Sequence, residues 1–288
     1  MKTCVFKVLV MLCIFTTGCR ASSLVYSLSD DQIRTSAPVL TDSPGRSGQI
    51  AVASVCRVIC PKKGSGGTAF LHKSGRVITA EHIVRGCKPE DIVLLTSKGK
   101  TIKVTKLITD ADSDLALLTP KSSLGGTSLP ISTESQVTIG SQVSVWGFPT
   151  GYNSGAPLLS VGYLAGQDVV QTPTGKRRIR WVVNTAINLG NSGGPLVHVE
   201  SGRVIGVVSS KLAPLPPYIE SALNALKKQK SGFTFTKTKT DGSTEQVSEA
   251  QVIEDVLQHL RSQTQLVIGH SVKSGDLTQF LKTNGLKP

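Results

Sequence analysis

Short segments rich in β-branched residues, each bounded by turn signals, run through most of this chain and limit the folds open to it. Residues 50–60, 68–72 and 101–108 are examples, and Lys98-Gly99 is one of the turns. Glycine occurs 28 times and 39% of the 288 residues are hydrophobic, so a β-rich domain with a substantial core is expected. Short strands at regular spacing, with almost no helix among them, favour a barrel or a sandwich.

A second series of strands begins near Pro130 and is similar in size to the first. Its six members are predicted at residues 142–147, 158–165, 169–171, 178–183, 194–199 and 204–209. We therefore expect a mostly β chain with two antiparallel six-stranded β-barrels side by side. The first would cover residues 50–129, and the second, with a following helix, residues 130–230.

The pattern changes after Leu212, where helical spacing replaces alternation. Apolar residues recur at helical spacing after Pro216-Pro217, and Ser248-Glu249-Ala250-Gln251 has the form of a capping box that starts another helix. Residues 233–247 are typical of a hairpin, and residues 276–282 of a last helix. These features predict an α+β extension over residues 231–288 that packs on the second barrel.

The first 21 residues have the form of a signal peptide. Lys2 and Lys7 flank its start, and Val8–Phe15 is an unbroken apolar run that is too short to span a bilayer. The protein is therefore expected to be exported, to the periplasm or cell envelope or to the medium. Residues 22–49, rich in Ser, Asp, Pro and Gly, are predicted to form an N-terminal arm.

The end of this segment leaves two outcomes open. Thr16-Thr17-Gly18-Cys19 is similar to a bacterial lipoprotein processing site, in which the cysteine is acylated, although Thr16 stands where such sites usually carry Leu. Acylation of Cys19 would attach the protein to a membrane. The alternative is ordinary cleavage near Cys19-Arg20-Ala21.

The basic charge does not by itself indicate a nucleic-acid partner. The formal net charge is +13, and removal of residues 1–21 takes away Lys2, Lys7 and Arg20 and leaves +10. Only 5% of the residues are aromatic, and no nucleic-acid-binding motif is present, so stacking on bases is not expected. The charge is interpreted as favouring solubility and adhesion to anionic surfaces.

Three cysteines, Cys56, Cys60 and Cys87, lie beyond the predicted leader and Cys19. Because an exported protein meets an oxidising compartment, one disulfide is expected, joining Cys87 to either Cys56 or Cys60 and leaving one thiol over. Cys56 and Cys60 would lie too far apart on one strand to bond to each other. No His/Cys pair has the spacing of metal ligands, so no metal or other cofactor is expected.

The segment Gly190-Asn191-Ser192-Gly193-Gly194-Pro195-Leu196 carries the clearest chemical signal in the chain. Glycine adopts positive φ at little cost, so this run can bend sharply and aim successive backbone N–H groups at one point. A serine at such a bend offers an exposed hydroxyl beside donors for an oxyanion, which is what acyl transfer requires. The alternative interpretation is a glycine-rich turn between two strands.

Four motifs in order resemble those of trypsin-like, chymotrypsin-fold serine proteases, and most closely the bacterial Deg/HtrA type. The resemblance covers roughly residues 50–212. The motifs are Gly66-Gly67-Thr68-Ala69-Phe70, Ile78-Thr79-Ala80-Glu81-His82-Ile83-Val84, Asp114-Leu115-Ala116-Leu117-Leu118 and Asn188–Leu196. The order His, Asp, Ser is that of the chymotrypsin arrangement and implies a chymotrypsin-like pair of barrels.

The resemblance implies a role for each of these residues. Ser192 would attack the scissile carbonyl, His82 would take and return its proton, and Asp114 would fix the tautomer of His82. The oxyanion hole would comprise Gly190, Asn191 and Ser192, with the N–H groups of Gly190 and Ser192 as donors. Asp110 and Asp112 are interpreted as turn formers, and His72 as a solvated residue beside a hairpin turn.

The substrate pocket is predicted to be small and apolar. The resemblance places Ala186 at its base, with Ile187 beside it and Val208, Ser209 and Ser210 on the other wall. The absence of a carboxylate there predicts cleavage after small or aliphatic residues. Either Ser209 or Ser210 is expected to hydrogen-bond Asp114.

The predicted function is that of an exported serine endopeptidase that cuts unfolded or exposed segments of envelope proteins. Deg/HtrA proteins usually carry PDZ domains after the protease, and no carboxylate-binding loop of that kind is recognisable after residue 212. Two alternatives therefore stay open: a processing protease dedicated to one partner, or a catalytically silent binding protein on the same fold. Polypeptide substrates are the expected partners, and the oligomeric state is not predicted.

Overall fold

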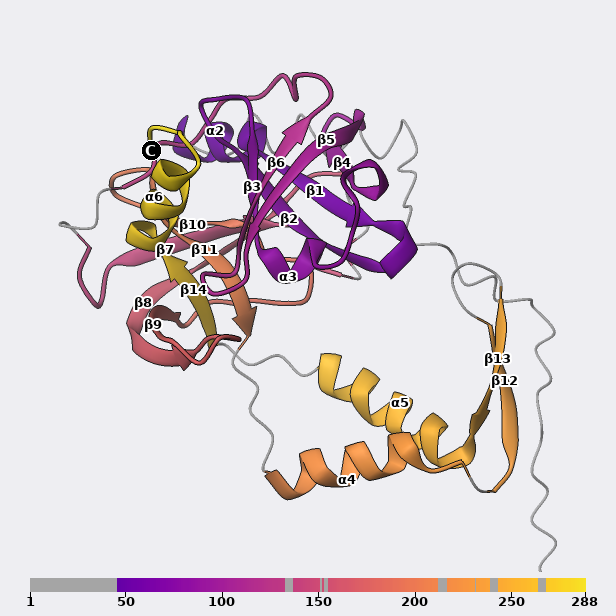
Figure 1. The fold of residues 1–288 in the computed structure, drawn as a ribbon. Coiled ribbons are helices and arrows are strands. Elements are labelled where there is room, and N and C mark those ends of the chain that lie inside the picture. Colours follow the sequence, from indigo (N-terminus) through magenta and orange to yellow (C-terminus); the bar gives the residue numbers. More distant parts are fainter. Residues whose placement is uncertain are drawn as a thin grey trace, which may run out of the picture.

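The computed structural model describes residues 46–132, 137–150, 152, 155–211, 217–230, 232–238, 243–263 and 268–288 (Figure 1). The predicted signal peptide, Cys19 and most of the predicted arm lie outside these residues. Within them, none of the helices has both the length and the apolar character needed to cross a membrane.

The first barrel closes through six antiparallel strands in the order β1-β2-β3-β6-β5-β4. The strands are β1 (Val55–Cys60), β2 (Ser65–Leu71), β3 (Val77–Thr79), β4 (Val93–Thr96), β5 (Thr101–Asp110) and β6 (Leu115–Pro120). In the first half of β5, Ile102 and Val104 are buried while Lys103 is exposed, which is the alternation expected of a strand with one face in the core. Three short turns of helix join the strands: η1 (Pro61–Lys63), α3 (Glu81–Val84) and η2 (Pro89–Asp91).

The second barrel closes in the order β10-β11-β14-β9-β8-β7, again with antiparallel pairing. Its strands are β7 (Gln142–Gly147), β8 (Leu158–Gln171), β9 (Arg177–Val183), β10 (Pro195–His198), β11 (Arg203–Lys211) and β14 (Gly269–Lys273). The prediction of a mostly β chain with two six-stranded antiparallel barrels is therefore confirmed.

The membership of the second barrel differs from the prediction. Residues 158–165 and 169–171 belong to one long strand, β8, which passes through a register irregularity between Leu164 and Gly166. The sixth strand is instead β14, which lies between β11 and β9. The predicted boundary at residue 230 is thus wrong for this barrel, because a strand from the predicted extension completes it.

Residues 212–268 form an insertion between two neighbouring strands of that barrel. Its described elements are α4 (Pro217–Lys228), the hairpin β12 (Thr234–Thr238) and β13 (Thr244–Ser248), and α5 (Glu249–Gln263). The capping box is present, since Gln251 N–H bonds Ser248 Oγ at 3.3 Å and Ser248 N–H bonds Gln251 Oε1 at 2.8 Å. In Figure 1 the two helices and the hairpin lie below and to the side of the barrels.

The start of the first barrel also differs from the prediction. Residues 50–54 were expected to extend the strand, but they belong to helix α2 (Arg46–Ser54). Ala51, Val52 and Val55 are buried together against the core that the two barrels share. Ser54 Oγ bonds the carbonyl of Ile50 at 2.7 Å, a contact one helical turn back that suits a helix end.

A shared hydrophobic cluster joins the two barrels. Phe70 and Ile78 contribute from the first barrel, Trp146 and Val207 from the second, and all are almost fully buried. Helix α6 (Ser274–Thr283) adds apolar side chains to the same cluster. The barrels are therefore fixed to each other through a continuous core, which holds the cleft between them in one geometry.

The end of the chain returns to the first barrel. His72 Nε2 lies 3.1 Å from the carbonyl oxygen of Lys287, and Lys73 Nζ bonds Pro288 O. The prediction that His72 is solvated is therefore wrong, because the C-terminal residues cover it and leave it 2% exposed. Burial lowers the pKa of this imidazole.

Candidate active site

His82 lies on α3, a single helical turn that follows β3 of the first barrel. Ile83 and Val84 on the same turn are buried in the barrel core and fix its position, while the His82 side chain stays about one-third exposed. Glu81 is buried and pairs with Arg85 at 2.6 Å.

Asp114 stands at the tight connection between β5 and β6 and receives His82. Both carboxylate oxygens lie 3.0 Å from His82 Nδ1, and Oδ1 also accepts the backbone N–H of His82 at 3.0 Å. Asp114 has φ of +58°, the one positive value among the described residues other than glycine. Asp tolerates this left-handed conformation better than most residues, and here it turns the carboxylate toward the histidine.

The protonation of Asp114 is set by opposing effects. Burial acts to raise its pKa, but hydrogen bonds from His82 and from Ser209 outweigh it and hold the pKa below the ordinary value of a carboxyl. The Ser209 hydroxyl donates to Oδ2 at 2.5 Å. Of the two serines predicted as partners, Ser209 is therefore the one bound, whereas the side chain of Ser210 lies outside the described residues.

Asp110 and Asp112 shape the approach to Asp114. Asp110 Oδ1 accepts the backbone N–H groups of Asp112 and Ser113 at 3.0 and 3.3 Å, which makes it a turn former as predicted. Asp112 bonds the hydroxyl of Thr174 at 2.7 Å, and this bond is the main cause that lowers its pKa to about 2. Neither carboxylate bonds His82 in the described structure.

The loop that carries Ser192 depends on its glycines. Gly190 and Gly193 have φ of +95° and +84°. A Cβ at Gly193 would lie 2.2 Å from the carbonyl oxygen of Thr68, and one at Gly190 would lie 2.3 Å from that of Phe148. Both positions therefore require glycine for conformation and for space, which explains the motif around the serine.

The backbone of this loop leaves two donors available. Asn191 N–H bonds Asn188 O at 3.0 Å and Gly193 N–H bonds Val208 O at 2.7 Å. Across the described part of the chain, no hydrogen bond occupies the backbone N–H of Gly190 or of Ser192. These are the two groups that the sequence predicted as oxyanion donors.

The hydroxyl of Ser192 points to Ser209 rather than to His82. Ser192 Oγ donates to the carbonyl oxygen of Ser209 at 2.9 Å. No hydrogen bond between Ser192 Oγ and His82 is present among the described residues. The structure thus brings the three predicted residues to one cleft with the His82–Asp114 pair formed and the serine side chain turned aside.

A cavity of about 400 Å³ opens beside Ser192 and is lined by His82, Gly190 and mainly apolar residues. Its walls come from both barrels, with Val58, Ile59 and Ile83 on one side and Phe148, Pro149 and Leu189 on the other. Among the described residues that line it, Arg57 is the one Lys or Arg side chain, and none is Asp or Glu. The cavity can accommodate apolar groups of a polypeptide next to the serine.

The residues predicted for the substrate pocket lie near the serine loop but do not line this cavity. Ala186 is exposed and its carbonyl accepts Asn191 Nδ2 at 3.3 Å, whereas Ile187 and Val208 are buried in the core of the second barrel. Ser209 contacts both Asp114 and Ser192. The sequence analysis did not predict that Val58, Phe148 and Leu189 line the cavity. Leu189 lies next to the serine loop in sequence, but Val58 and Phe148 belong to none of the four motifs.

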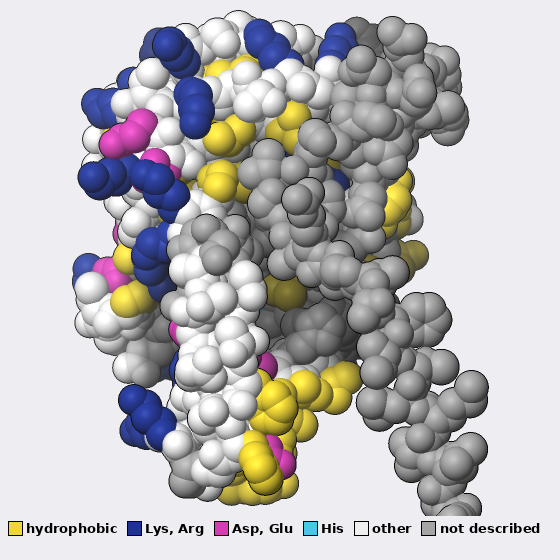
Figure 2. Space-filling view, turned by 90° about the vertical axis from the view of Figure 1, so that its right-hand side faces the viewer, with side chains coloured by type: hydrophobic (Ala, Val, Ile, Leu, Met, Phe, Trp, Pro, Cys, Tyr) yellow, Lys and Arg dark blue, Asp and Glu magenta, His cyan; other side chains and the backbone are white. Residues whose placement is uncertain are grey.

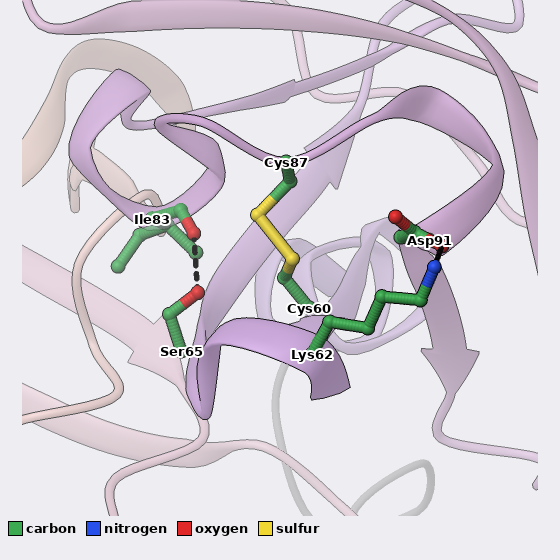
Figure 3. The surroundings of a disulfide bond; sticks show 6 residues. All are labelled: Cys60, Lys62, Ser65, Ile83, Cys87 and Asp91. Carbon is green, nitrogen blue, oxygen red and sulfur yellow. Dashed lines mark hydrogen bonds and ion pairs between the residues drawn. A yellow bond between two sulfur atoms is a disulfide. The ribbon is translucent and has the colours of Figure 1, made fainter.

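A disulfide links the end of β1 to the residues that follow α3 (Figure 3). The structure joins Cys60, at the end of β1, to Cys87, which follows α3. Lys62 pairs with Asp91 at 2.7 Å, and Ser65 Oγ donates to Ile83 O at 2.9 Å, so three links tie the His82 segment to the neighbouring turn. Cys56 is a free, fully buried thiol, and burial raises its pKa to about 12, which makes it unreactive.

The family described as "Trypsin-like peptidase domain" matches residues 67–207. Similar curated proteins include the chloroplastic Protease Do-like 1 of Arabidopsis thaliana, 31% identical over 53% of this chain, and the serine protease Do-like HtrA of Lactococcus lactis subsp. cremoris, 32% identical over 52%. This chain spans about a third of their length, 34% and 36% respectively.

Solved structures support the fold. The inactive form of the Rv3671c protease aligns with a TM-score of 0.51 and 23% identity, covering 62% of this chain and 86% of that one. The structure of an HtrA-type protease, AlgW, with a tripeptide aligns with a TM-score of 0.51 and 18% identity. This alignment covers 66% of this chain and 65% of that one. These structures show the fold of two closed barrels, and the family match and the curated relatives show that residues 67–207 are similar to a trypsin-like peptidase domain, with HtrA/Deg-type serine proteases as distant relatives over about half of the chain.

Proposed function

We propose that the chain is a serine endopeptidase in which Ser192 is the nucleophile, His82 the general base and Asp114 the group that orients the base. The observation that carries this proposal is the His82–Asp114 pair, in which both carboxylate oxygens lie 3.0 Å from Nδ1 and His82 lines the same cavity as Ser192. This pairing leaves Nε2 of His82 as the ring nitrogen free to accept a proton.

The first step requires a small rotation of the serine side chain. Ser192 Oγ donates to Ser209 O and must turn to His82 Nε2 before it can be deprotonated. A substrate whose backbone N–H takes Ser209 O as its acceptor would displace the hydroxyl and favour this rotation. Oγ then bonds to the scissile carbonyl carbon as its proton moves to His82, which later delivers it to the leaving amine.

The developing oxyanion is stabilised by the backbone N–H groups of Gly190 and Ser192. Both groups lack an acceptor in the described structure and lie at the bend where Gly190 has positive φ. A preformed pair of donors lowers the barrier because the dipoles need no reorientation during the reaction. Water then attacks the acyl carbon as His82 takes its proton, and His82 returns that proton to Ser192 Oγ as the ester bond breaks and the acid product leaves.

Substrates are proposed to be unfolded or exposed polypeptide segments, cut after small or aliphatic residues. The predicted pocket residues Ala186 and Ile187 are uncharged, and none of the described residues that line the cavity beside Ser192 is Asp or Glu, so neither offers an ion-pair partner to a Lys or Arg side chain. The names of the similar proteins, Do-like and HtrA serine proteases, support a related role. Export to the cell envelope, with Cys19 either acylated or removed, belongs to the same proposal, and mass spectrometry of the mature N-terminus would distinguish the two.

The test is cleavage-site profiling on an unfolded protein with the wild type and Ser192→Ala. Cleavage by the wild type after Val, Ala, Ile or Leu, and none by the variant, is the expected result. Equal digestion by both would overturn the assignment of Ser192. Cleavage of one folded candidate but not of unfolded chains would favour a dedicated processing protease.

A catalytically silent binding protein is the second candidate, and one observation favours it. Ser192 Oγ is engaged with Ser209 O instead of with His82. The profiling experiment distinguishes the two candidates. A catalytically silent protein would leave the unfolded substrate uncut both as the wild type and as Ser192→Ala.

A further inference from the structure

The segment Phe148–Thr150, which follows β7, is the platform on which the oxyanion loop rests. Thr150 N–H bonds Leu189 O at 2.7 Å. The Cα of Gly190 lies so close that a Cβ there would be 2.3 Å from Phe148 O and 2.9 Å from Thr150 N. Any displacement of this platform would therefore move the peptide that carries the Gly190 N–H.

Arg57, on β1 of the opposite barrel, contacts the platform at Phe148 and the chain just beyond it at Tyr152. Its guanidinium donates from Nη2 to Tyr152 O at 2.9 Å, and its Cζ lies 5.0 Å from the centre of the Phe148 ring. Arg57 is only 8% exposed, so water competes weakly for these contacts. One side chain thus ties the segment after β7 to the first barrel.

Thr68 provides a second link to the same loop. Its hydroxyl donates to Gly190 O at 2.6 Å and accepts Phe148 N–H at 3.0 Å. Thr68 thus bonds the carbonyl of Gly190 and the backbone N–H at the start of the platform, whereas Arg57 contacts the ring of Phe148 and the carbonyl of Tyr152. The two contacts act on different atoms, so the loss of Arg57 need not be compensated by Thr68.

We propose that Arg57 is a positioning residue that holds the oxyanion donors in their reactive geometry through its contacts with Phe148 and Tyr152. The inference rests on the proposed function. Oxyanion donors act at 2.7–3.1 Å from the developing charge, and a displacement of about 1 Å can reduce the rate on the order of a hundredfold. Arg57 need not touch the reacting atoms to have this effect.

The test compares Arg57→Met and Arg57→Lys with the wild type, and uses Arg178→Met as a matched control. Arg178 is also an inter-element arginine, paired with Asp276 at 3.0 Å, but it does not contact the platform. The readouts are kcat and KM on a short peptide ester, hydrogen exchange of the peptide that contains residues 186–192, and the thermal unfolding midpoint.

For Arg57→Met we expect kcat to fall about 10- to 100-fold with KM changed less than about threefold, and faster exchange in residues 186–192. Arg57→Lys keeps the charge but lacks the planar fork, so it should recover part of the loss. Arg178→Met should keep both kcat and the exchange rate of that peptide.

Unchanged kcat and unchanged exchange in both Arg57 variants would overturn the proposal, as would an equal loss in Arg178→Met. If the wild type itself proves inactive, the proposed function fails, but hydrogen exchange still tests Arg57 without any turnover. If Arg57→Met does not fold, Arg57→Lys carries the same readouts.

Discussion

The barrels and the insertion at residues 212–268 bury their apolar residues to very different extents. The barrels contain three clusters of almost fully buried side chains. In the insertion, Tyr218 and Phe233 are 73% and 79% exposed, and one face of α5 exposes Ile253, Val256, Leu257 and Leu260. Figure 2 shows hydrophobic side chains gathered at the lower end of the molecule, the height at which the insertion lies in Figure 1.

The difference shows which part of the chain determines the fold. Lys211 and Gly269 are register partners on β11 and β14, so the insertion occupies the place of a hairpin loop. The barrels close through β14 without requiring any element of the insertion. The catalytic geometry should therefore respond strongly to changes in the barrels and weakly to changes in the insertion.

The largest expected effect comes from the pair that joins α3 to the β5–β6 connection. Asp114→Asn should reduce kcat by roughly 10⁴-fold, because the amide no longer holds the required tautomer of His82. The measurement is steady-state turnover of a peptide ester. Asp112→Asn, which alters a nearby carboxylate bound to Thr174, should stay within about twofold. Similar losses in both variants would contradict the assignment of Asp114.

The glycines of the serine loop should be the next most sensitive positions. Gly193→Ala would place a Cβ 2.2 Å from Thr68 O at positive φ, so we expect the free energy of unfolding to fall by about 3 kcal/mol or more. Gly175→Ala has a similar φ of +82° but open space around its Cβ, and should lose only about 1 kcal/mol. Urea unfolding of the two variants gives the comparison, and equal losses would show that crowding at Gly193 is unimportant.

The disulfide between Cys60 and Cys87 should contribute a smaller amount. The two cysteines are 27 residues apart in sequence, so the disulfide restricts the unfolded chain. Replacing Cys60 and Cys87 by Ser should therefore lower the free energy of unfolding by about 3 kcal/mol or somewhat less. Reductant should destabilise the wild type to the same level and leave the double variant unchanged. A further shift of the double variant in reductant would point to a different cystine.

The smallest effect is expected from removing the insertion. Replacing residues 212–268 by Asn-Gly would join β11 to β14 through a two-residue hairpin, and we expect the free energy of unfolding to change by about 1 kcal/mol or less. Urea unfolding and turnover of a short peptide ester are the measurements. A chain that no longer folds would show that the insertion is part of the structural core.

The conformation of the serine loop could be predicted from sequence because its requirements are local. Gly190 and Gly193 have positive φ and no room for a Cβ, so these positions require glycine and can be recognised in the sequence. The order of His82, Asp114 and Ser192 supplied the rest. The rotation of the Ser192 hydroxyl toward Ser209 depends on a single torsion angle and leaves no such trace.

Features that depend on long-range pairing could not be predicted in the same way. Strand β14 pairs with β11 and β9, and the insertion separates it from both in sequence, so its five residues gave no barrel signal. The sequence pattern could not decide whether Ser209 or Ser210 bonds Asp114. A register shift between Val208 and Ser210 breaks the alternation of strand faces on which such a prediction depends. Ile50–Ser54 became helical because packing of Ala51 and Val52 on the shared core outweighed β propensity.

The most direct test of the account is labelling with a fluorophosphonate, which reacts with an activated serine hydroxyl. We expect a single adduct on Ser192 in the folded wild type, at a rate that falls sharply in Asp114→Asn, and none in Ser192→Ala. Labelling can be located by mass spectrometry of the digested protein. A folded wild type that does not react, or one that reacts at another serine, would contradict the assignment of Ser192, His82 and Asp114 as the catalytic residues.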